Sequence, residues 1–282
     1  MIIEISNEKL TAQINSLGAE LQSLVLKNTG REYVWYGKKE IWSGRSPLLF
    51  PIIGRLLDDK YCLDGKEYSL PKHGFARRNE FDSEKLSENK AKFTFRQTAK
   101  TLEVYPFCFE MEVTFELDGS RINVIHEIKN TNDREMYFSF GAHPAFNVEK
   151  NAKIVFDKDE TLATLKVDSE GLRTGKKEEY IVSSRELPID EKTFLDDALI
   201  FENVKSNGGS LFEDSKKLLH FTWGNAPYLG FWAKPGAPYV CIEPWFGVND
   251  SQEKTADFSQ KQGIEKLCAG ETFSYCWSAE IF

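Results

Sequence analysis

The feature that most constrains this chain is a two-residue alternation of apolar and polar side chains. In residues 110–117 every second side chain is apolar, and residues 121–128 follow the same alternation except at Ile125 and His126. This period places the apolar side chains on one face of a β-strand. Asp118 and Gly119 separate the two segments, and this dipeptide favours a tight hairpin turn. The sequence therefore predicts an antiparallel hairpin here.

The same alternation recurs along the chain, and a second hairpin is expected around Asp64 and Gly65. Further strands are expected at residues 2–6, 10–14, 21–26, 33–36, 92–96, 137–140, 153–156, 163–167, 217–222, 228–233, 239–243 and 273–281. Helical signals are limited to single turns at 190–194 and 255–262, and the polar residues 168–177 are expected to form a loop. Short strands without βαβ alternation predict an all-β sandwich or barrel. No linker or repeat divides the chain, so one domain over residues 1–282 is expected.

Charge and cysteine content narrow the class of protein. The 282 residues carry 36 Lys and Arg against 44 Asp and Glu, a net charge of -8. This balance argues against nucleic-acid or anionic-membrane binding, which needs a basic face. The five Cys have no zinc-site spacing and are expected to be free thiols. With no signal-peptide pattern at the start and no long apolar run, we expect a cytoplasmic protein.

Each of the four His can be weighed separately. His126 and His220 lie within predicted strands, which favours a structural role. His73 and His143 instead follow strand-like runs and precede irregular segments, where binding and catalytic residues concentrate. Imidazole exchanges protons near neutral pH, so His73 and His143 are candidates for catalysis.

One acidic residue stands out among aromatic side chains. Glu243 ends an apolar strand and is followed closely by Trp245. Partial desolvation there would raise the pKa of the carboxyl group towards the range of a general base. Trp245 could also stack on the C–H face of a sugar. A strand-end Glu that points to water is the alternative.

Three arginines are candidates for holding an anion or hydroxyl groups. Arg55 follows the apolar run 47–53, Arg45 lies ten residues earlier, and Arg77 comes shortly after His73. The fixed donors of a guanidinium suit phosphate or hydroxyl oxygens, although surface ion pairs would also explain these residues. Nucleotide-binding, zinc-protease and serine-hydrolase motifs are absent from the sequence.

Five motifs in order carry a family resemblance: SPLLFPIIGRL at 46–56, KHGFARRNEF at 72–81, GAHPAFN at 141–147, FLDDALIF at 194–201 and VCIEPWFGVND at 240–250. Together they resemble the aldose 1-epimerase (galactose mutarotase) superfamily, and within it the LacX-like branch. The resemblance covers essentially the whole chain. It implies a large antiparallel β-sandwich and an isomerase that interconverts the α and β anomers of a hexose. It implies no metal or other cofactor, an aldose or aldose phosphate as the partner molecule, and a monomer or homodimer.

The resemblance also implies roles for individual residues. Glu243 matches the catalytic base, His143 the general acid and His73 the second active-site His. Arg55 matches the substrate-binding Arg. The sugar-binding Asp matches Asp196, or Asp197 after a shift of one residue.

Two departures bear on the substrate. Pro244 and Trp245 stand where galactose mutarotases have a Gln-containing segment, so the sugar pocket is expected to differ. Arg77 resembles an arginine of the hexose-6-phosphate epimerase branch, which leaves free and phosphorylated sugars as alternatives. A sugar-binding protein without catalysis, and a glycosidase or lyase using Glu243 with Asp196, are competing hypotheses. The latter would need two carboxylates that flank the bond and would leave the two His without a role.

Overall fold

The computed structural model describes residues 1–149, 151–253 and 255–282. A four-stranded antiparallel sheet lies at the N-terminal end of the chain. It comprises β1 (Ile2–Ser6), β2 (Leu10–Asn15), β3 (Glu20–Leu26) and β4 (Arg31–Glu32). In β2 the side chains of Leu10, Ala12 and Ile14 are fully buried, whereas the polar side chains between them are not. This alternation gives the sheet one face that must be covered.

The covering layer belongs to a much larger sheet. In spatial order its path among the described residues is β5 (Leu48–Leu49), β13 (Phe140–Ala142), β21 (Tyr239–Phe246), β20 (Tyr228–Trp232), β17 (Leu199–Glu202), β15 (Ala152–Val167), β18 (Gly208–Glu213), β19 (Lys216–Thr222), β23 (Thr272–Ile281), β11 (Arg121–Asn130), β10 (Phe109–Asp118), β9 (Lys90–Arg96) and β8 (Asp82–Ser87). Two strands lie off this path: β14 (Ala145–Asn147) pairs with β21, and β16 (Arg173–Ile189) pairs with β15.

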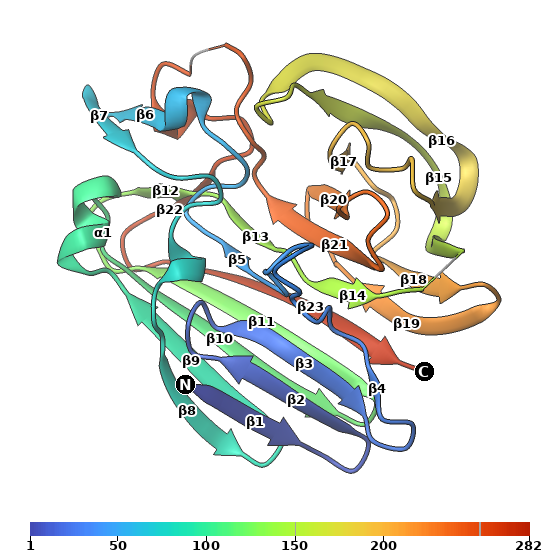
Figure 1. Cartoon of the computed structure of the whole chain (residues 1–282). Coiled ribbons are helices and arrows are strands. Elements are labelled where there is room, and N and C mark those ends of the chain that lie inside the picture. Colours follow the sequence, from blue (N-terminus) through green and yellow to red (C-terminus); the bar gives the residue numbers. More distant parts are fainter. Residues whose placement is uncertain (150, 254) are drawn as a thin grey trace.

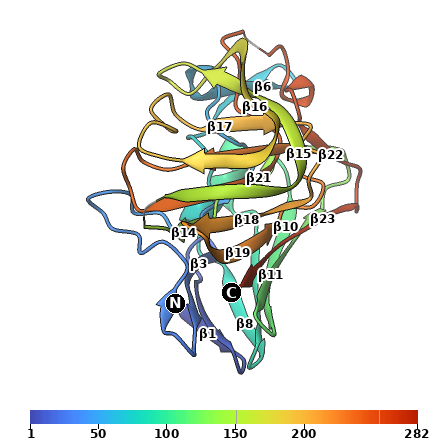
Figure 2. The ribbon, with the colours of Figure 1, turned by 90° about the vertical axis from the view of Figure 1, so that its right-hand side faces the viewer.

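The two sheets form an antiparallel β-sandwich. Strands β1–β4 lie in front of β8–β11 (Figure 1), and β1 contacts β8, β9 and β10. The apolar side chains of β10, from Phe109 to Leu117, all point into the core, as the alternation predicts. The rest of the large sheet, including β15, β17 and β21, extends beyond this sandwich (Figure 2). The expected all-β fold is confirmed.

Small elements complete the described structure. A hairpin joins β6 (Lys60–Leu63) to β7 (Lys66–Ser69), and a separate antiparallel pair joins β12 (Met136–Phe138) to the distant strand β22 (Glu265–Leu267). Helical structure is limited to α1 (Ala99–Val104) and three 3-10 turns at 57–59, 76–78 and 258–260. Among the described residues no helix is long and apolar enough to cross a bilayer. All five cysteines are unpaired, as expected.

Several local predictions need correction. Residues 173–177 are the start of β16 and not the end of a loop, so the connection spans only 168–172. β16 escaped detection because most of its side chains are exposed at a sheet edge, where no alternation is required. Residues 33–36 form no strand, and only Val34 bridges to Phe146. Helix α1 was missed, and the expected turn at 190–194 is not helical.

Candidate active site

Strand β21 carries the predicted base. All eight residues of β21 are buried, and it pairs with β20 on one side and with β13 and β14 on the other. Alternation places Cys241, Glu243 and Trp245 on the same face. Gly230 of β20 is opposite Glu243, and a Cβ there would lie 2.9 Å from the Trp245 ring. The glycine therefore leaves room for the indole beside the carboxyl group.

His143 lies in the short break between β13 and β14. Because both strands pair with β21, the break brings the imidazole over Glu243, and Nε2 is 3.3 Å from Oε1. Pro144 follows and restricts His143 to extended backbone geometry. The Trp42 ring stacks on the imidazole with a centroid distance of 5.1 Å. The predicted acid and base are thus neighbours.

His73 approaches the same point from another segment. Its ring centroid is 6.0 Å from that of His143. The backbone N–H of Gly54 donates to Nδ1 of His73 at 3.1 Å. Since Nδ1 accepts, the proton of the neutral imidazole belongs on Nε2, which makes Nε2 a hydrogen-bond donor. His73 also has a left-handed backbone with φ of 65°, a strained geometry of the kind found at functional sites.

Burial dominates the electrostatics of these groups. Desolvation raises the pKa of Glu243 well above its usual range, and Asp197 adds to the shift. Trp245 and Lys72 lower the pKa of Glu243 and oppose this effect. Desolvation lowers the pKa of His143 to about 3. Neither charged form is favoured, so at neutral pH the pair retains one proton between its two members.

Burial acts on His73 in the same direction. Desolvation lowers the pKa of its imidazole well below the usual value, and the neighbouring His143, Arg77 and Lys72 add to the effect. His73 is therefore neutral at neutral pH, and it can donate a hydrogen bond without carrying a charge.

These groups line a cavity of about 250 Å³. Its wall is completed mainly by Trp42, Lys72, Arg77, Asp197, Trp232 and Asn249. Five buried polar atoms of the lining residues have no hydrogen-bond partner among the described residues: Arg77 Nε, His143 Nδ1, Glu243 Oε2, Trp245 Nε1 and Asn249 Oδ1. Buried polar groups are normally paired, so such a concentration in one cavity indicates a site that awaits a polar ligand.

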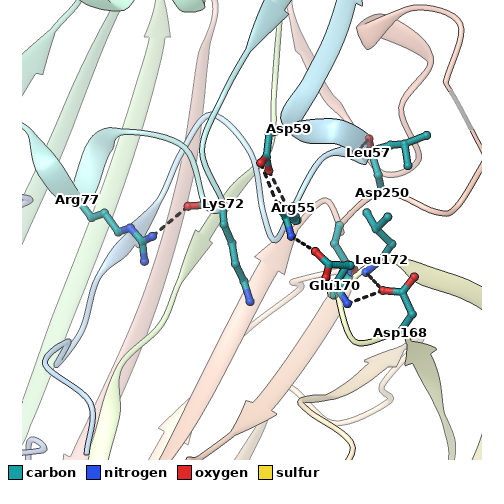
Figure 3. Close-up of polar contacts among 11 residues, drawn as sticks. Arg55, Leu57, Asp59, Lys72, Arg77, Asp168, Glu170, Leu172 and Asp250 are labelled. Carbon is teal, nitrogen blue, oxygen red and sulfur yellow. Dashed lines mark hydrogen bonds and ion pairs between the residues drawn. The ribbon is translucent and has the colours of Figure 1, made fainter. Parts of the chain in front are cut away.

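The structure brings together most of the residues predicted from the sequence. Glu243, His143, His73, Trp245 and Arg77 all line the cavity. Two cations of this cavity, Lys72 and Arg77, form no ion pair among the described residues, and the Arg77 side chain instead donates to the Lys72 carbonyl (Figure 3).

The structure places the Arg55 side chain outside the residues that line the cavity. Its guanidinium forms ion pairs with Asp59 and Glu170 (Figure 3). The carboxylates satisfy the donors that were expected to hold the substrate. Gly54, the residue that precedes Arg55, does line the cavity.

Two other predicted residues also lie outside the cavity. The Asp196 side chain is 81% exposed and pairs with Lys166. Its neighbour Asp197, the other position that the resemblance allowed, lines the cavity. Asp197 has a left-handed φ of 77°. The guanidinium of Arg45 donates to the Gln22 carbonyl and does not reach the cavity.

Sequence reasoning did not select Trp42, Lys72, Trp232 or Asn249. Lys72 and Asn249 lie inside motifs that were identified, at 72–81 and 240–250, so their position next to His73 and Glu243 was an available signal. Trp42 and Trp232 had no such signal, because the core contains many aromatic side chains.

One group of side chains has the chemistry of a metal site. His143, Cys241 and Glu243 offer ligand atoms that all lie within 4.8 Å of one another. Nitrogen, sulfur and carboxylate ligands suit zinc. However, burial raises the pKa of the Cys241 thiol well above its usual range, which disfavours the thiolate that a metal would need.

Comparison with known proteins agrees with this geometry. The family model described as aldose 1-epimerase matches residues 1–275. The chain belongs to the aldose 1-epimerase family. It is an isomerase that acts on sugars. The LacX protein encoded on a plasmid of Lactococcus lactis subsp. lactis is 30% identical over 96% of each chain.

Solved structures of family members have the same fold. A galactose mutarotase-like protein from Lactobacillus casei ATCC 334 superposes with a TM-score of 0.95 at 31% identity and covers both chains fully. A galactose mutarotase related enzyme from Lactobacillus acidophilus superposes with a TM-score of 0.94 at 31% identity, covering 100% of this chain and 97% of that one. The sandwich fold implied by the sequence motifs is therefore confirmed.

Proposed function

We propose that this epimerase interconverts the α and β anomers of a hexose by opening and closing the sugar ring. The observation that carries the proposal is the acid–base pair of His143 and Glu243 in a cavity with five unpartnered buried polar atoms. A hexose presents many hydroxyl groups that can satisfy such atoms. A pair that exchanges protons is what ring opening requires.

In this mechanism Glu243 removes the proton from the anomeric hydroxyl, and protonated His143 donates a proton to the ring oxygen. The C1–O5 bond breaks and the aldehyde forms. Rotation about C1–C2 followed by the reverse transfers closes the ring on the other face. Moving the shared proton from Glu243 to His143 leaves the total charge of the pair unchanged. The buried pair can thus present a carboxylate base and an imidazolium acid without gaining net charge.

His73 supports the same reaction. Its neutral imidazole, with the proton on Nε2, can donate a hydrogen bond to the oxygen that develops negative charge. Trp42 and Trp232 form flat walls beside His143 that suit the C–H face of a sugar ring. Asp197 and Trp245 offer further hydrogen-bonding groups at the wall.

The first test replaces the base. Glu243→Gln keeps the shape of the side chain and removes its basicity. We expect anomer exchange, measured by NMR on glucose and galactose, to fall by about 100-fold or more. The circular dichroism spectrum should be unchanged, because the substitution leaves the core volume intact. Near-normal exchange in the folded variant would show that Glu243 is not the base.

A second substrate class is favoured by the charges of the cavity. Lys72 and Arg77, which form no ion pair with any described residue, bring two cations to a pocket where a neutral sugar needs none. A phosphate ester on the sugar would supply the matching anion. The alternative function is therefore a hexose-6-phosphate 1-epimerase.

The two classes separate in a substrate comparison. If the phosphate matters, glucose 6-phosphate should exchange faster than glucose, and Arg77→Gln should raise the KM for the phosphorylated sugar about tenfold or more. The matched control is Arg78→Gln, which alters an exposed neighbour outside the cavity. Equal KM values for both sugars in the wild type and in the Arg77 variant would exclude phosphate recognition.

A further inference from the structure

Asn249 presents an unusual combination of contacts at the cavity wall. It follows β21 by three residues and is 5% exposed. Its Nδ2 donates to the carbonyl of Gly171, another lining residue. That contact decides the orientation of the amide, because a flipped amide would place Oδ1 against the carbonyl oxygen. Oδ1 is thereby left buried and has no partner among the described residues.

The surroundings hold this side chain still. Gly54 packs so closely that a Cβ there would lie 2.3 Å from the Asn249 Cβ. The Asn249 carbonyl accepts from Arg173 Nε at 2.7 Å. The next residue, Asp250, forms a buried ion pair with Lys261 at 2.6 Å, which ties the segment to its neighbours. Asn249 Oδ1 is therefore an acceptor in a fixed position, as a recognition group should be.

We propose that Asn249 Oδ1 accepts a hydrogen bond from one hydroxyl group of the sugar and so determines which aldoses are good substrates. This inference rests on the proposed function. An amide oxygen has no proton to exchange and carries no charge, so it suits a neutral hydroxyl donor. A sugar without that hydroxyl leaves Oδ1 buried and unpaired, which is costly, and the site rejects it.

The test measures kcat/KM for glucose and its 2-, 3-, 4- and 6-deoxy analogues with the wild type and with Asn249→Ala. For one analogue we expect a loss of about tenfold in the wild type. Asn249→Ala should lose a similar factor on glucose and show no further loss on that same analogue. If the variant lowers kcat/KM for every sugar by the same factor, Asn249 is only structural and the proposal fails.

A second variant guards against simple misfolding. Asn249→Asp keeps an acceptor oxygen but loses the donor to Gly171. It should retain the preference for the selected hydroxyl, whereas a structural role would make it as defective as Asn249→Ala. The matched control is Asn147→Ala, because Asn147 also has a buried unpartnered Oδ1 but does not line the cavity. Asn147→Ala should leave the ranking of the analogues unchanged.

A binding measurement separates this inference from the proposed function. Dissociation constants for the same sugars are obtained by NMR titration of Glu243→Gln with and without Asn249→Ala. The same analogue-specific difference in binding would support Asn249 even if no anomer exchange occurred. Exchange without any analogue-specific difference would overturn the role of Asn249 and leave the epimerase mechanism standing. Failure to bind any of these sugars would overturn the role of Asn249 in recognising a free hexose, and failure to bind glucose 6-phosphate in the same titration would overturn the epimerase mechanism as well.

Discussion

Lys261 and Glu243 are both buried ionisable residues, yet their surroundings differ. The ammonium of Lys261 contacts the Val248 carbonyl and Asp250, each at 2.6 Å. Glu243 instead keeps one carboxylate oxygen without a partner in the described structure. Burying a charged group is costly unless it is paired. The paired lysine therefore serves the fold, whereas the incompletely paired carboxyl group is available for chemistry.

His126 is an exception that can be tested. It is buried between Phe140 and Tyr275, and neither ring nitrogen has a partner among the described residues. It does not line the cavity. Burial lowers the pKa of His126 to about 3. The folded state thus keeps His126 neutral over a pH range in which the unfolded state protonates it.

The sign of the effect follows from this difference. Below the unfolded pKa of about 6.5 the unfolded chain binds the extra proton, so His126 makes folding less stable as the pH falls towards 3. Between pH 6.5 and 5 the wild type should lose about 2 kcal/mol more unfolding free energy than His126→Leu. Urea denaturation at both pH values measures this difference. Parallel losses in the two proteins would contradict it.

Individual residues show where motif matching stops being informative. Glu243, His143 and His73 could be selected because each occupies a distinctive motif. Asp196 and Asp197 are identical in type and adjacent, so the motif alone could not tell which of them lines the cavity, whereas the structure places Asp197 there. Arg55 was matched by position, but its two carboxylate partners come from distant or unmatched segments.

At the level of elements, local patterns predicted hairpins well. The predicted hairpin joins β10 and β11, but its two loop residues are Gly119 and Ser120, one position later than the predicted Asp118–Gly119 turn, because Asp118 still pairs with Arg121. The long edge strand β16 could not be predicted in the same way. Its pairing with β15 contains several register shifts, which interrupt the two-residue period. Sequence periodicity therefore identifies a regular strand with partners on both sides better than an edge strand whose pairing is irregular.

The pairing of β20 with β21 leads to a prediction. Gly230→Ala would place a methyl group against the Trp245 ring and about 3.3 Å from the Glu243 Cβ. We expect a loss of about 1–3 kcal/mol in unfolding free energy from overpacking. Anomer exchange should fall as well, because the base and its neighbour are displaced.

Gly209→Ala is the matched control, since Gly209 lies in β18, outside the cavity, and its new methyl group would crowd the Trp223 ring. Both variants should lose stability in thermal unfolding, but only Gly230→Ala should lose exchange activity under folded conditions. Equal activity in the two variants would show that the spacing between β20 and β21 does not set the site.

At the scale of the whole molecule, the cavity gathers residues from Trp42 to Asn249. Alternation alone predicts strands but not which strands become neighbours, so it could not place these residues together. The order of the five motifs supplied the missing information through the family resemblance. The sequence could not predict the details of side-chain packing, such as the stacking of Trp42 on His143 and the orientation of the Asn249 amide.

The double pairing of β21 has a consequence for durability. His143 and Glu243 are held by neighbouring strands of one hydrogen-bonded sheet, with β13 and β14 both attached to β21. Separating the two groups requires rupture of that hydrogen-bonded ladder. Heat should thus remove activity only when it melts the protein as a whole. The temperature at which half of the activity is lost would then equal the unfolding midpoint measured by calorimetry. The remaining activity would report the fraction of molecules in which the sheet is intact.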